Sequence, residues 1–322
     1  MDSKLTGRDL LTTEDLSLDE LREIMLAAHK AKEGQRPLFL PHMNGRVALC
    51  FFERSTRTHQ SFLTAAQECN CNVIGFSSTE GTSVGKGESL ADTIATLAAY
   101  DTDLLVIRHP DVGSAKIAAD ICKFPVINAG DGNNQHPTQA LLDILCMLEY
   151  FGGFSVMPRG SNRSYELNFE VLQGKTVAIC GDLKNGRTLH SGIPLYRLLG
   201  MNLILCAPEE LQIPTPDAIE TCTTNELEYA LEAADILYMT RFQWERPGME
   251  ELQHLKGRYI LRRQTVERIN PTVAIMHPLP RIAGEHCEIY PDVDDLKNAL
   301  YFRLQTPCGM WTRIALLRLL MR

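Results

Sequence analysis

Short runs of consecutive apolar residues alternate with longer segments in which apolar side chains recur every three or four positions. In the first half of the chain the short runs predict buried strands at residues 46–52, 73–76, 104–107 and 125–128. The longer segments predict amphipathic helices at residues 55–69, 88–99 and 137–151. An earlier helix is expected to begin after Ser17, whose hydroxyl can cap it, and to stop near Gly34.

Residues 152–173 interrupt this alternation, because they are rich in Gly, Pro, Ser and Asn and carry few periodic apolar side chains. We therefore expect a domain junction there. The alternation then resumes, with strands predicted at residues 176–180, 203–206, 236–239, 259–261 and 273–276. We expect an α/β protein with two doubly wound, mainly parallel domains, residues 1–151 and 152–308, and a final helix at 309–322 that packs back on the first.

Charge and cysteine usage limit the possible partners and the compartment. The 322 residues include 32 Lys and Arg against 40 Asp and Glu, a formal net charge of −8, which argues against nucleic-acid binding through a basic face. The ten cysteines contain no C-x-x-C pair, which argues against a structural zinc site and is typical of a reducing compartment. Since the N-terminus lacks a signal-peptide core and no apolar run approaches the roughly 20 residues of a membrane span, we expect a cytoplasmic protein.

Ligands of doubly wound sheets bind beyond the carboxyl ends of the strands, and each motif that can carry chemistry follows a predicted strand. The first motif is Ser55-Thr56-Arg57-Thr58, at the start of a helix. Free N–H groups in a first helical turn bind anions, and an arginine fork suits phosphate. A capped helix with a solvated arginine is the alternative, but three hydroxyls beside one arginine favour a phosphate site.

The Gly-rich loop at residues 81–89 resembles a P-loop only in part. Three residues instead of four separate Gly81 from Gly85, and Gly87 follows Lys86 where a P-loop has Ser or Thr. Residues 181–188 have the P-loop spacing but carry arginine in place of the lysine. We therefore exclude a P-loop NTPase. The first loop can still close Ser83 and Lys86 over an anion, unless it is simply a solvated surface loop.

Arg108 follows the strand at residues 104–107, and His136 and Gln139 lie on one face of a helix start. These three side chains can donate hydrogen bonds to one carbonyl oxygen, as an oxyanion site requires. A purely structural histidine is the alternative. No serine or cysteine stands in the motif of a covalent hydrolase.

Two arginines follow strands in the second half of the chain. Arg187 comes after the strand at 176–180, and Arg241 with Gln243 comes after the strand at 236–239. An arginine binds a carboxylate through two parallel hydrogen bonds, so the pair can hold a dicarboxylate. The residues alone predict a phosphate site in the first domain, a dicarboxylate site in the second, and chemistry in the cleft between them.

These motifs resemble those of the aspartate/ornithine carbamoyltransferase family, from about residue 5 to the C-terminus apart from the junction. The matching stretches are residues 55–58, 108–110, 128–143, 181–188, 238–241 and 277–280. The resemblance implies transfer of a carbamoyl group from carbamoyl phosphate to an amine, with no cofactor, no metal and no covalent enzyme intermediate. It also implies a homotrimer with active sites shared between subunits, and it leaves regulatory or pathway partners open.

The resemblance also implies a role for each residue. Carbamoyl phosphate would be bound by Ser55, Thr56, Arg57, Thr58, Arg108, His136, Gln139, Pro278 and Leu279, with Ser83 and Lys86 supplied by a neighbouring subunit. The catalytic residues would be Arg57, Thr58, Arg108 and His136. Aspartate would be bound by Lys86, Arg187, Arg241 and Gln243.

Two features favour aspartate over ornithine as the acceptor. The ornithine branch typically carries a His-Cys-Leu-Pro turn, whereas residues 277–280 read His-Pro-Leu-Pro. Arg241 suits a second carboxylate and would repel the side-chain ammonium of ornithine. The resemblance therefore implies that the product is N-carbamoyl-L-aspartate, an intermediate of de novo pyrimidine biosynthesis. Two alternatives remain. The chain could carbamoylate another amine, or it could be a non-catalytic subunit that kept the fold.

The chain departs from the family pattern at four places, one of which is residues 307–309, where the usual polar turn before the final helix is missing. Arg54 replaces a small residue or proline, and it either modifies phosphate binding or points to solvent. The Gly-rich loop carries one lysine, Lys86, where some relatives have two. Residues 154–170 make the junction longer than usual, and we expect them to form a surface excursion.

Overall fold

The computed structural model describes residues 3–34, 45–159, 162–244, 249–255, 257–284 and 287–321. The chain forms two compact units. The first comprises Met1–Asn168, His190–Gly192 and Pro307–Arg322, and the second comprises Phe169–Leu189 and Ile193–Thr306. Among the described residues, none of the helices combines the length and the apolar character that a membrane span requires.

The first unit is built on a parallel sheet of four strands in the order β2-β1-β3-β4. These strands are β1 (Arg46–Phe51), β2 (Asn72–Phe76), β3 (Leu104–His109) and β4 (Val126–Asp131). The chain winds outward from β1 to β2 and then crosses to β3 and β4, so the sheet is doubly wound. β1 is buried along almost its whole length, as expected for a strand covered on both faces.

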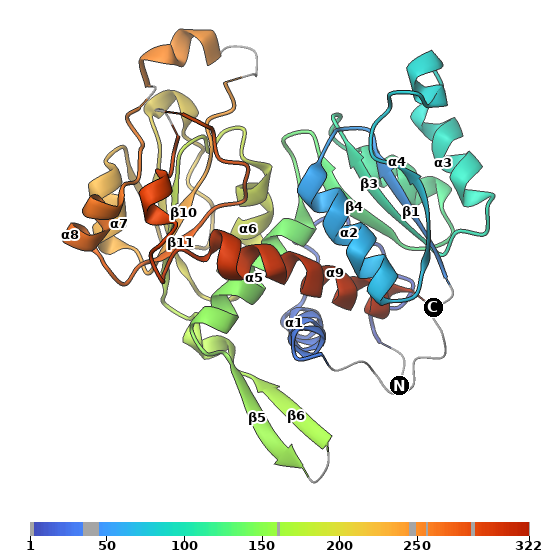
Figure 1. Ribbon diagram of the computed structural model, residues 1–322, viewed down its shortest axis with the longest axis horizontal. Helices are drawn as coiled ribbons and strands as arrows, with labels where there is room; N and C mark the ends of the chain where they lie inside the picture. Colours follow the sequence, from blue (N-terminus) through green and yellow to red (C-terminus); the bar gives the residue numbers. More distant parts are fainter. Residues whose placement is uncertain are drawn as a thin grey trace. The chain divides into compact units, whose positions relative to one another are not determined.

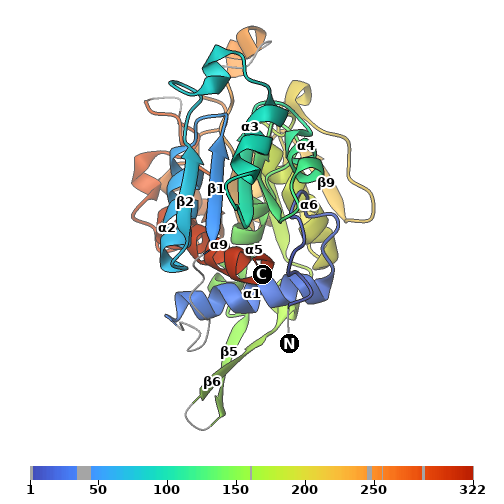
Figure 2. The same ribbon diagram turned by 90° about the vertical axis from the view of Figure 1, so that its right-hand side faces the viewer.

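Helices cover both faces of this sheet (Figure 1 and Figure 2). They include α2 (Thr56–Glu68), α3 (Leu90–Ala98), α4 (Ser114–Ile121) and α5 (Pro137–Tyr150), whereas α1 (Leu18–Lys32) packs against α5 and the strand that follows at residues 162–167. Ala48 and Cys50 of β1 form one apolar cluster with Ile94 of α3 and Ala118 of α4, and Figure 2 shows α2 on the opposite side of the strands. Burial of such side chains, at about 25 cal/mol per Å², is the main term that holds the layers together.

An antiparallel hairpin follows α5 and consists of β5 (Phe154–Arg159) and β6 (Asn162–Leu167), drawn in light green in Figure 1. It belongs to the first unit. Arg22 Nη1 of α1 donates to the Leu167 carbonyl at 2.6 Å, and the His29 ring stacks on Phe154 with centroids 4.0 Å apart. The first unit therefore extends to Asn168, beyond the boundary at residue 151 that the loss of helical periodicity suggests.

The last helix, α9 (Thr306–Leu320), belongs to the first unit from Pro307 onward. Its buried Arg313 donates to Ser61 Oγ of α2 at 2.7 Å and to Thr138 Oγ1 of α5 at 3.4 Å. The Gly7 N–H donates to the Leu320 carbonyl at 2.8 Å. Contacts with α2, α5 and the N-terminal segment thus hold this helix.

The second unit is built on a parallel sheet of five strands in the order β11-β10-β7-β8-β9. The strands are β7 (Thr176–Cys180), β8 (Asn202–Cys206), β9 (Thr221–Thr224), β10 (Ile236–Met239) and β11 (Ala274–Met276). The helices are α6 (Arg187–Leu198), α7 (Leu227–Ala233) and α8 (Arg263–Ile269). The two parallel sheets confirm the predicted doubly wound, mainly parallel α/β fold.

Two strands of the second unit differ from the prediction. The prediction of a strand at residues 259–261 is wrong, since Leu261 forms only an isolated bridge with Ile289. The edge strand β9 was not predicted, because its sequence, Thr-Cys-Thr-Thr, is polar and partly exposed and contains no apolar run.

Candidate active site

The start of α2 is suited to binding an anion. Ser55 is the N-cap residue in an extended conformation (φ −154°, ψ 105°), and within the described part of the chain its side chain makes no capping hydrogen bond. The first turn contains no acidic residue, so the positive end of the helix dipole is not offset. Thr56 and Arg57 are exposed, whereas Thr58 is buried. The N–H groups of this turn, together with Arg57, can hold a phosphate group.

Arg108 lies at the carboxyl end of β3, next to the end of β1. The two strands are paired there, and the Phe52 N–H donates to the Arg108 carbonyl at 2.8 Å. Arg108 is 8% exposed; its Nη2 donates to Glu53 Oε1 at 3.0 Å and its Nη1 donates to the Ala129 carbonyl at 3.3 Å. The site therefore contains a buried cation whose direction is set by a carboxylate.

Asp131, the last residue of β4, orders the loop that leads into α5. Its Oδ1 accepts hydrogen bonds from the Gln135 N–H at 3.0 Å and from Asn128 Nδ2 at 2.9 Å. Its Oδ2 accepts one from the Gly113 N–H at 2.8 Å. A buried carboxylate with this many partners fixes the loop in one conformation.

His136 and Gln139 project from the start of the helix after this loop. His136 is the N-cap residue of α5, is buried, and donates its N–H to Ser191 Oγ at 2.7 Å. Gln139 Nε2 donates to Asp143 Oδ1 at 3.0 Å, one turn further along α5. The backbone of His136 and the side chain of Gln139 are thus held by neighbours before any substrate binds.

Ser83 and Lys86 lie in a short 3₁₀ helix, Ser83–Lys86, in the loop after β2. Both are exposed. The Thr82 hydroxyl donates to the Thr79 carbonyl at 2.7 Å, and Gly87 ends the helix with φ +96°, a conformation that glycine adopts without strain. The loop therefore presents a hydroxyl and a cation to the outside of the first unit.

The first sheet brings these groups to one edge, because its four parallel strands all end there. Hydroxyls, backbone N–H groups and cations predominate at this edge, which suits a compact anion that also has a carbonyl group. In strand order from β2 to β4, the residues are Ser83 and Lys86, residues 55–58, Arg108, and His136 with Gln139.

In the second unit, the loops after β7 and β10 are joined by hydrogen bonds. Buried Asp182 accepts from the Asn185 side chain at 3.0 Å and from the Gln243 N–H at 3.4 Å. Gln243 Nε2 donates to the Asn185 carbonyl at 2.8 Å. Gly181 has φ +123°, and a Cβ there would lie 2.4 Å from the Thr240 carbonyl oxygen, so only glycine permits this approach.

Arg187 is the first residue of α6, after β7, and Arg241 follows β10. Both are half-buried. Since β7 and β10 are adjacent parallel strands, the two arginines and Gln243 come to one edge of the second sheet. Two guanidinium forks and an amide at one edge can bind two carboxylates.

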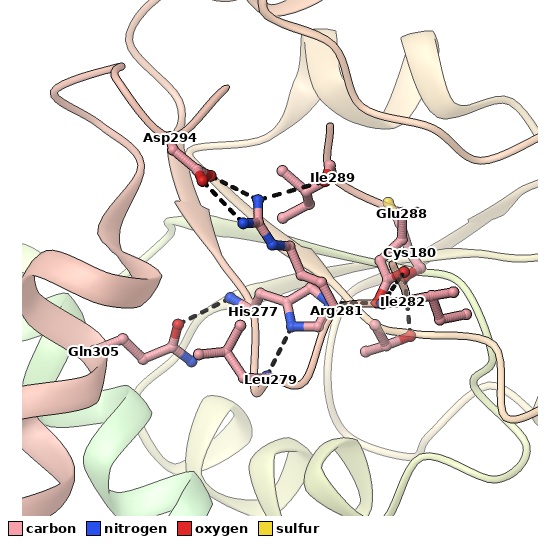
Figure 3. A network of polar contacts seen from close by, with 10 residues as sticks. Cys180, His277, Leu279, Arg281, Ile282, Glu288, Ile289, Asp294 and Gln305 are labelled. Carbon is pink, nitrogen blue, oxygen red and sulfur yellow. Dashed lines mark hydrogen bonds and ion pairs between the residues drawn. The ribbon is translucent and has the colours of Figure 1, made fainter. Parts of the chain in front are cut away.

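β11 lies next to β10 and leads into a turn that contributes backbone groups (Figure 3). The Leu279–Pro280 peptide bond is cis, and Leu279 has φ +55°. The Leu279 N–H donates to His277 Nδ1 at 2.7 Å. The turn, which includes Pro278, thus has a fixed shape beside the strand that precedes Arg241.

Arg281 anchors the far side of this turn. It forms two hydrogen bonds with Asp294, Nη1 to Oδ1 at 2.6 Å and Nη2 to Oδ2 at 2.9 Å (Figure 3). Burial alone would raise the pKa of Asp294, but the hydrogen bonds from Arg281 and Tyr301 outweigh it and lower the pKa. The carboxylate is therefore ionised at neutral pH, and the pair is a true ion pair.

Two family models together match most of the chain. The model of the carbamoyl-P binding domain of aspartate/ornithine carbamoyltransferase matches residues 8–149, and that of the Asp/Orn binding domain matches residues 173–320. The chain belongs to the aspartate/ornithine carbamoyltransferase family. The first match contains β1 to β4 and the second contains β7 to β11, so in the sequence the hairpin of β5 and β6 falls between the two matches.

Individual carbamoyltransferases are similar over nearly the whole chain. The aspartate carbamoyltransferase catalytic subunits of Thermococcus kodakarensis and Clostridium perfringens are each 40% identical, over 97% of this chain and over 96% and 97% of theirs. The aspartate transcarbamoylase of Trypanosoma cruzi, solved with carbamoyl aspartate and phosphate, superposes with a TM-score of 0.83 at 30% identity, over 99% of this chain and 98% of that one. The catalytic subunit of the M. jannaschii aspartate transcarbamoylase gives 0.80 at 36% identity, over 97% of each chain.

Arg54, which departs from the pattern of this carbamoyltransferase family, points to solvent. Its side chain is 77% exposed and pairs with Glu80, which is 79% exposed. Exposed ion pairs contribute at most about 1 kcal/mol. The structure therefore favours the second of the two readings that the sequence leaves open, a surface arginine rather than a phosphate ligand.

Two charged neighbours of the candidate site are not indicated by the motifs. Glu53 pairs with Arg108, but nothing in its local sequence indicates a partner on β3. Arg313 lies inside an apolar helical stretch and is 3% exposed. Since arginine is rarely fully buried, a lone arginine in such a stretch is a signal that sequence analysis could have used.

Proposed function

We propose that this chain transfers the carbamoyl group of carbamoyl phosphate to the amine of L-aspartate and releases N-carbamoyl-L-aspartate and phosphate. The observation that carries the proposal is the carboxyl edge of the first sheet, where residues 55–58, Arg108 and His136 gather. The activity named for the similar proteins of T. kodakarensis and T. cruzi supports aspartate as the acceptor.

The phosphate group is bound by Ser55, Thr56, Arg57 and Thr58. Hydroxyls and N–H groups of the first turn of α2 donate to the phosphate oxygens, and the helix dipole and Arg57 balance their charge. This environment also stabilises the phosphate as it departs with the bonding electron pair. Catalysis here depends on position and charge, with no covalent intermediate.

The carbonyl oxygen accepts hydrogen bonds from Thr58, Arg108 and His136. When the lone pair of the neutral amine forms the C–N bond, the C=O π electrons move to this oxygen, where the three donors stabilise the negative charge. The electrons then return, the C–O bond to phosphate breaks, and the proton lost by the nitrogen passes to the departing phosphate. One such donor is worth about 2.7–4 kcal/mol of barrier.

Two further groups orient the substrates. Gln139 and the carbonyls of Pro278 and Leu279 hold the carbamoyl amide, which has hydrogens to donate and an oxygen to accept. The carboxylates of aspartate bind to Arg187 and Arg241, with Gln243 beside them, because two arginine forks match two carboxylates.

We further propose a homotrimer in which Ser83 and Lys86 complete the site of a neighbouring copy, where Lys86 also contacts aspartate. Both residues are exposed and belong to the loop after the edge strand β2, which leaves them accessible to another subunit. A cytoplasmic location in de novo pyrimidine biosynthesis is part of the same proposal. All ten cysteines are free thiols, which suits a reducing compartment.

The experiment that tests the function is phosphate release from carbamoyl phosphate with L-aspartate or with L-ornithine, with the carbamoylated product identified by mass. Release with aspartate alone is the expected result. Release with ornithine alone would keep the assignment of the first sheet and overturn that of Arg187 and Arg241. No release with either acceptor, from folded protein, would overturn the proposed reaction.

Shared sites have a separate test. Lys86→Ala and Arg108→Ala should each abolish most activity, because each removes one part of every site. Mixed trimers of the two variants would contain some sites in which both residues are present, so activity should reappear after subunit exchange. A mixture that stays inactive, although sedimentation shows mixed trimers, would place Lys86 and Arg108 in the same chain's site.

A further inference from the structure

The ring of His277 connects two parts of the network that follows β11 (Figure 3). Nδ1 lies 2.7 Å from the Leu279 nitrogen, and Nε2 lies 2.9 Å from Glu288 Oε1. The side chains of His277 and Glu288 are 0% and 1% exposed. Gln305 Oε1 accepts the His277 N–H at 2.9 Å, which fixes the backbone as well. Water does not reach either end of the ring.

These contacts determine where the imidazole carries its proton. A backbone N–H can only donate, so Nδ1 of His277 must accept from Leu279 and cannot carry a hydrogen. The neutral ring therefore has its proton on Nε2 and donates it to Glu288 Oε1. A doubly protonated ring, or one protonated on Nδ1, would place two N–H groups against each other. The Glu288 carboxylate favours the observed form through a charge-assisted hydrogen bond.

The tautomer of His277 in turn directs the turn that follows it. The peptide unit between Pro278 and Leu279 is trans and planar, so its carbonyl points away from its N–H. By holding the Leu279 N–H, His277 therefore aims the Pro278 carbonyl. The same bond holds Leu279 at φ +55°, in the left-handed region that leucine rarely adopts.

We propose that Glu288 is a positioning residue for the carbamoyl group. It fixes the His277 tautomer, and through it the direction of the Pro278 carbonyl and the φ of Leu279, the two residues whose carbonyls accept hydrogen bonds from the carbamoyl amide. This inference rests on the proposed function, because the two carbonyls matter only if carbamoyl phosphate is the ligand. Glu288 also accepts from the Ile282 N–H at 3.2 Å, which closes the loop around the turn.

The kinetic test compares Glu288→Leu with a matched control, Glu267→Leu. Both remove a glutamate carboxylate, but Glu267 pairs with Arg263 at an exposed position of α8, away from the turn after β11. Glu288→Leu should raise KM for carbamoyl phosphate about tenfold and change kcat by less than about threefold, since one hydrogen bond used equally in ground and transition state is weakened. Glu267→Leu should leave KM near the wild-type value. Equal KM values for wild type and Glu288→Leu would overturn the proposal.

A rescue distinguishes control of the tautomer from a general effect on folding. An asparagine side chain can accept a hydrogen bond from the backbone N–H two residues later. Unlike an imidazole ring, its amide has no tautomers, so it does not need Glu288 to keep the accepting atom unprotonated. The double variant His277→Asn with Glu288→Leu should therefore recover a lower KM than Glu288→Leu alone. No recovery in the double variant would contradict a role of Glu288 through the ring.

Nitrogen NMR of wild-type protein, labelled with ¹⁵N-histidine, gives a readout that requires no variant to fold. The His277 ring should show a protonated Nε2 and an unprotonated Nδ1. An imidazolium ring, or a proton on Nδ1, would overturn the inference even if the enzyme is active. Conversely, wild-type protein that fails to carbamoylate aspartate would overturn the proposed function while leaving the tautomer result readable.

Discussion

Arg108 and Glu53 form an ion pair at the carboxyl edge of the first sheet, with Nη2 3.0 Å from Oε1. The arginine side chain is 10% exposed and the glutamate side chain 36%, so solvent reaches the acid more than the base. The pair joins the end of β3 to the segment that enters the first turn of α2, the proposed phosphate site. A movement of Glu53 would therefore also move the cation that is proposed to polarise the carbonyl.

Glu53→Gln should lower kcat about tenfold. A neutral amide holds the guanidinium less firmly than a carboxylate, and the difference of about 1.4 kcal/mol between a charged and a neutral hydrogen bond corresponds to a factor of ten. Steady-state kinetics with saturating substrates measure this effect. Glu80→Gln, which removes the exposed partner of Arg54, is the control and should retain wild-type kcat. An unchanged kcat in Glu53→Gln would show that Arg108 is held by other contacts.

Arg57→Ala should lower turnover by two to four orders of magnitude while the fold remains intact. The reason is that the exposed Arg57 side chain contributes little to packing but is assigned to the phosphate that leaves in the reaction. Arg54→Ala is the matched control. Arg54 is a nearby arginine that is also exposed, but it pairs with Glu80. We expect the control to stay within about threefold of wild type. Similar losses in both variants would indicate that total charge, rather than the position of Arg57, supports catalysis.

Buried elements of the fold could be predicted because their periodicity reflects burial. The apolar run at 104–107 and the helical pattern at 137–151 correspond to β3 and α5, whose residues are almost all buried. The Ser17 cap was also predictable, and it forms a capping box with Glu20. β9 and the β5–β6 hairpin were not, since partly exposed strands do not need apolar side chains on either face.

Some residues of the candidate site could likewise be predicted from the sequence, and others could not. Arg108 and His136 could be found because they follow apolar strands, and parallel strands end at one edge of a sheet. Glu53 and Glu288 could not, because their importance depends on which side chain the fold places opposite them. Glu288 is eleven residues beyond His277, and only the turn between them brings the two together.

Arg313→Met should lower the free energy of unfolding by about 2–4 kcal/mol, since the buried guanidinium donates to α2 and α5 and its loss leaves Ser61 and Thr138 without that donor. Burial and the neighbouring Arg108 lower the pKa of Arg313 to about 9, so the side chain remains a cation at neutral pH. Urea denaturation measures the change. Arg303→Met, at an exposed position, is the control and should unfold like wild type. Equal midpoints for both variants would mean that methionine packs as well as the arginine does.

Glu149 connects α5 to α1, and its ionisation should make stability depend on pH. Its Oε1 lies 2.6 Å from His29 Nδ1, and its Oε2 accepts from Lys32 Nζ at 2.5 Å. Burial alone would raise the pKa of Glu149, but the hydrogen bonds from His29 and Lys32 outweigh it and lower the pKa below the ordinary value of 4.5. As the pH falls, the unfolded chain therefore takes up this proton first. The stabilising contribution is complete above the ordinary pKa and disappears as the pH passes below the folded one.

Glu149→Gln should therefore lower the free energy of unfolding by about 1–3 kcal/mol at neutral pH, and the difference from wild type should shrink between about pH 5 and pH 3. Urea denaturation at a series of pH values measures both curves. Asp120→Asn is the control, because Asp120 pairs with Lys116 at an exposed position and should give a curve parallel to wild type. If the difference between Glu149→Gln and wild type were as large at pH 3 as at pH 7, the stabilisation would come from the shape of the side chain and not from its charge.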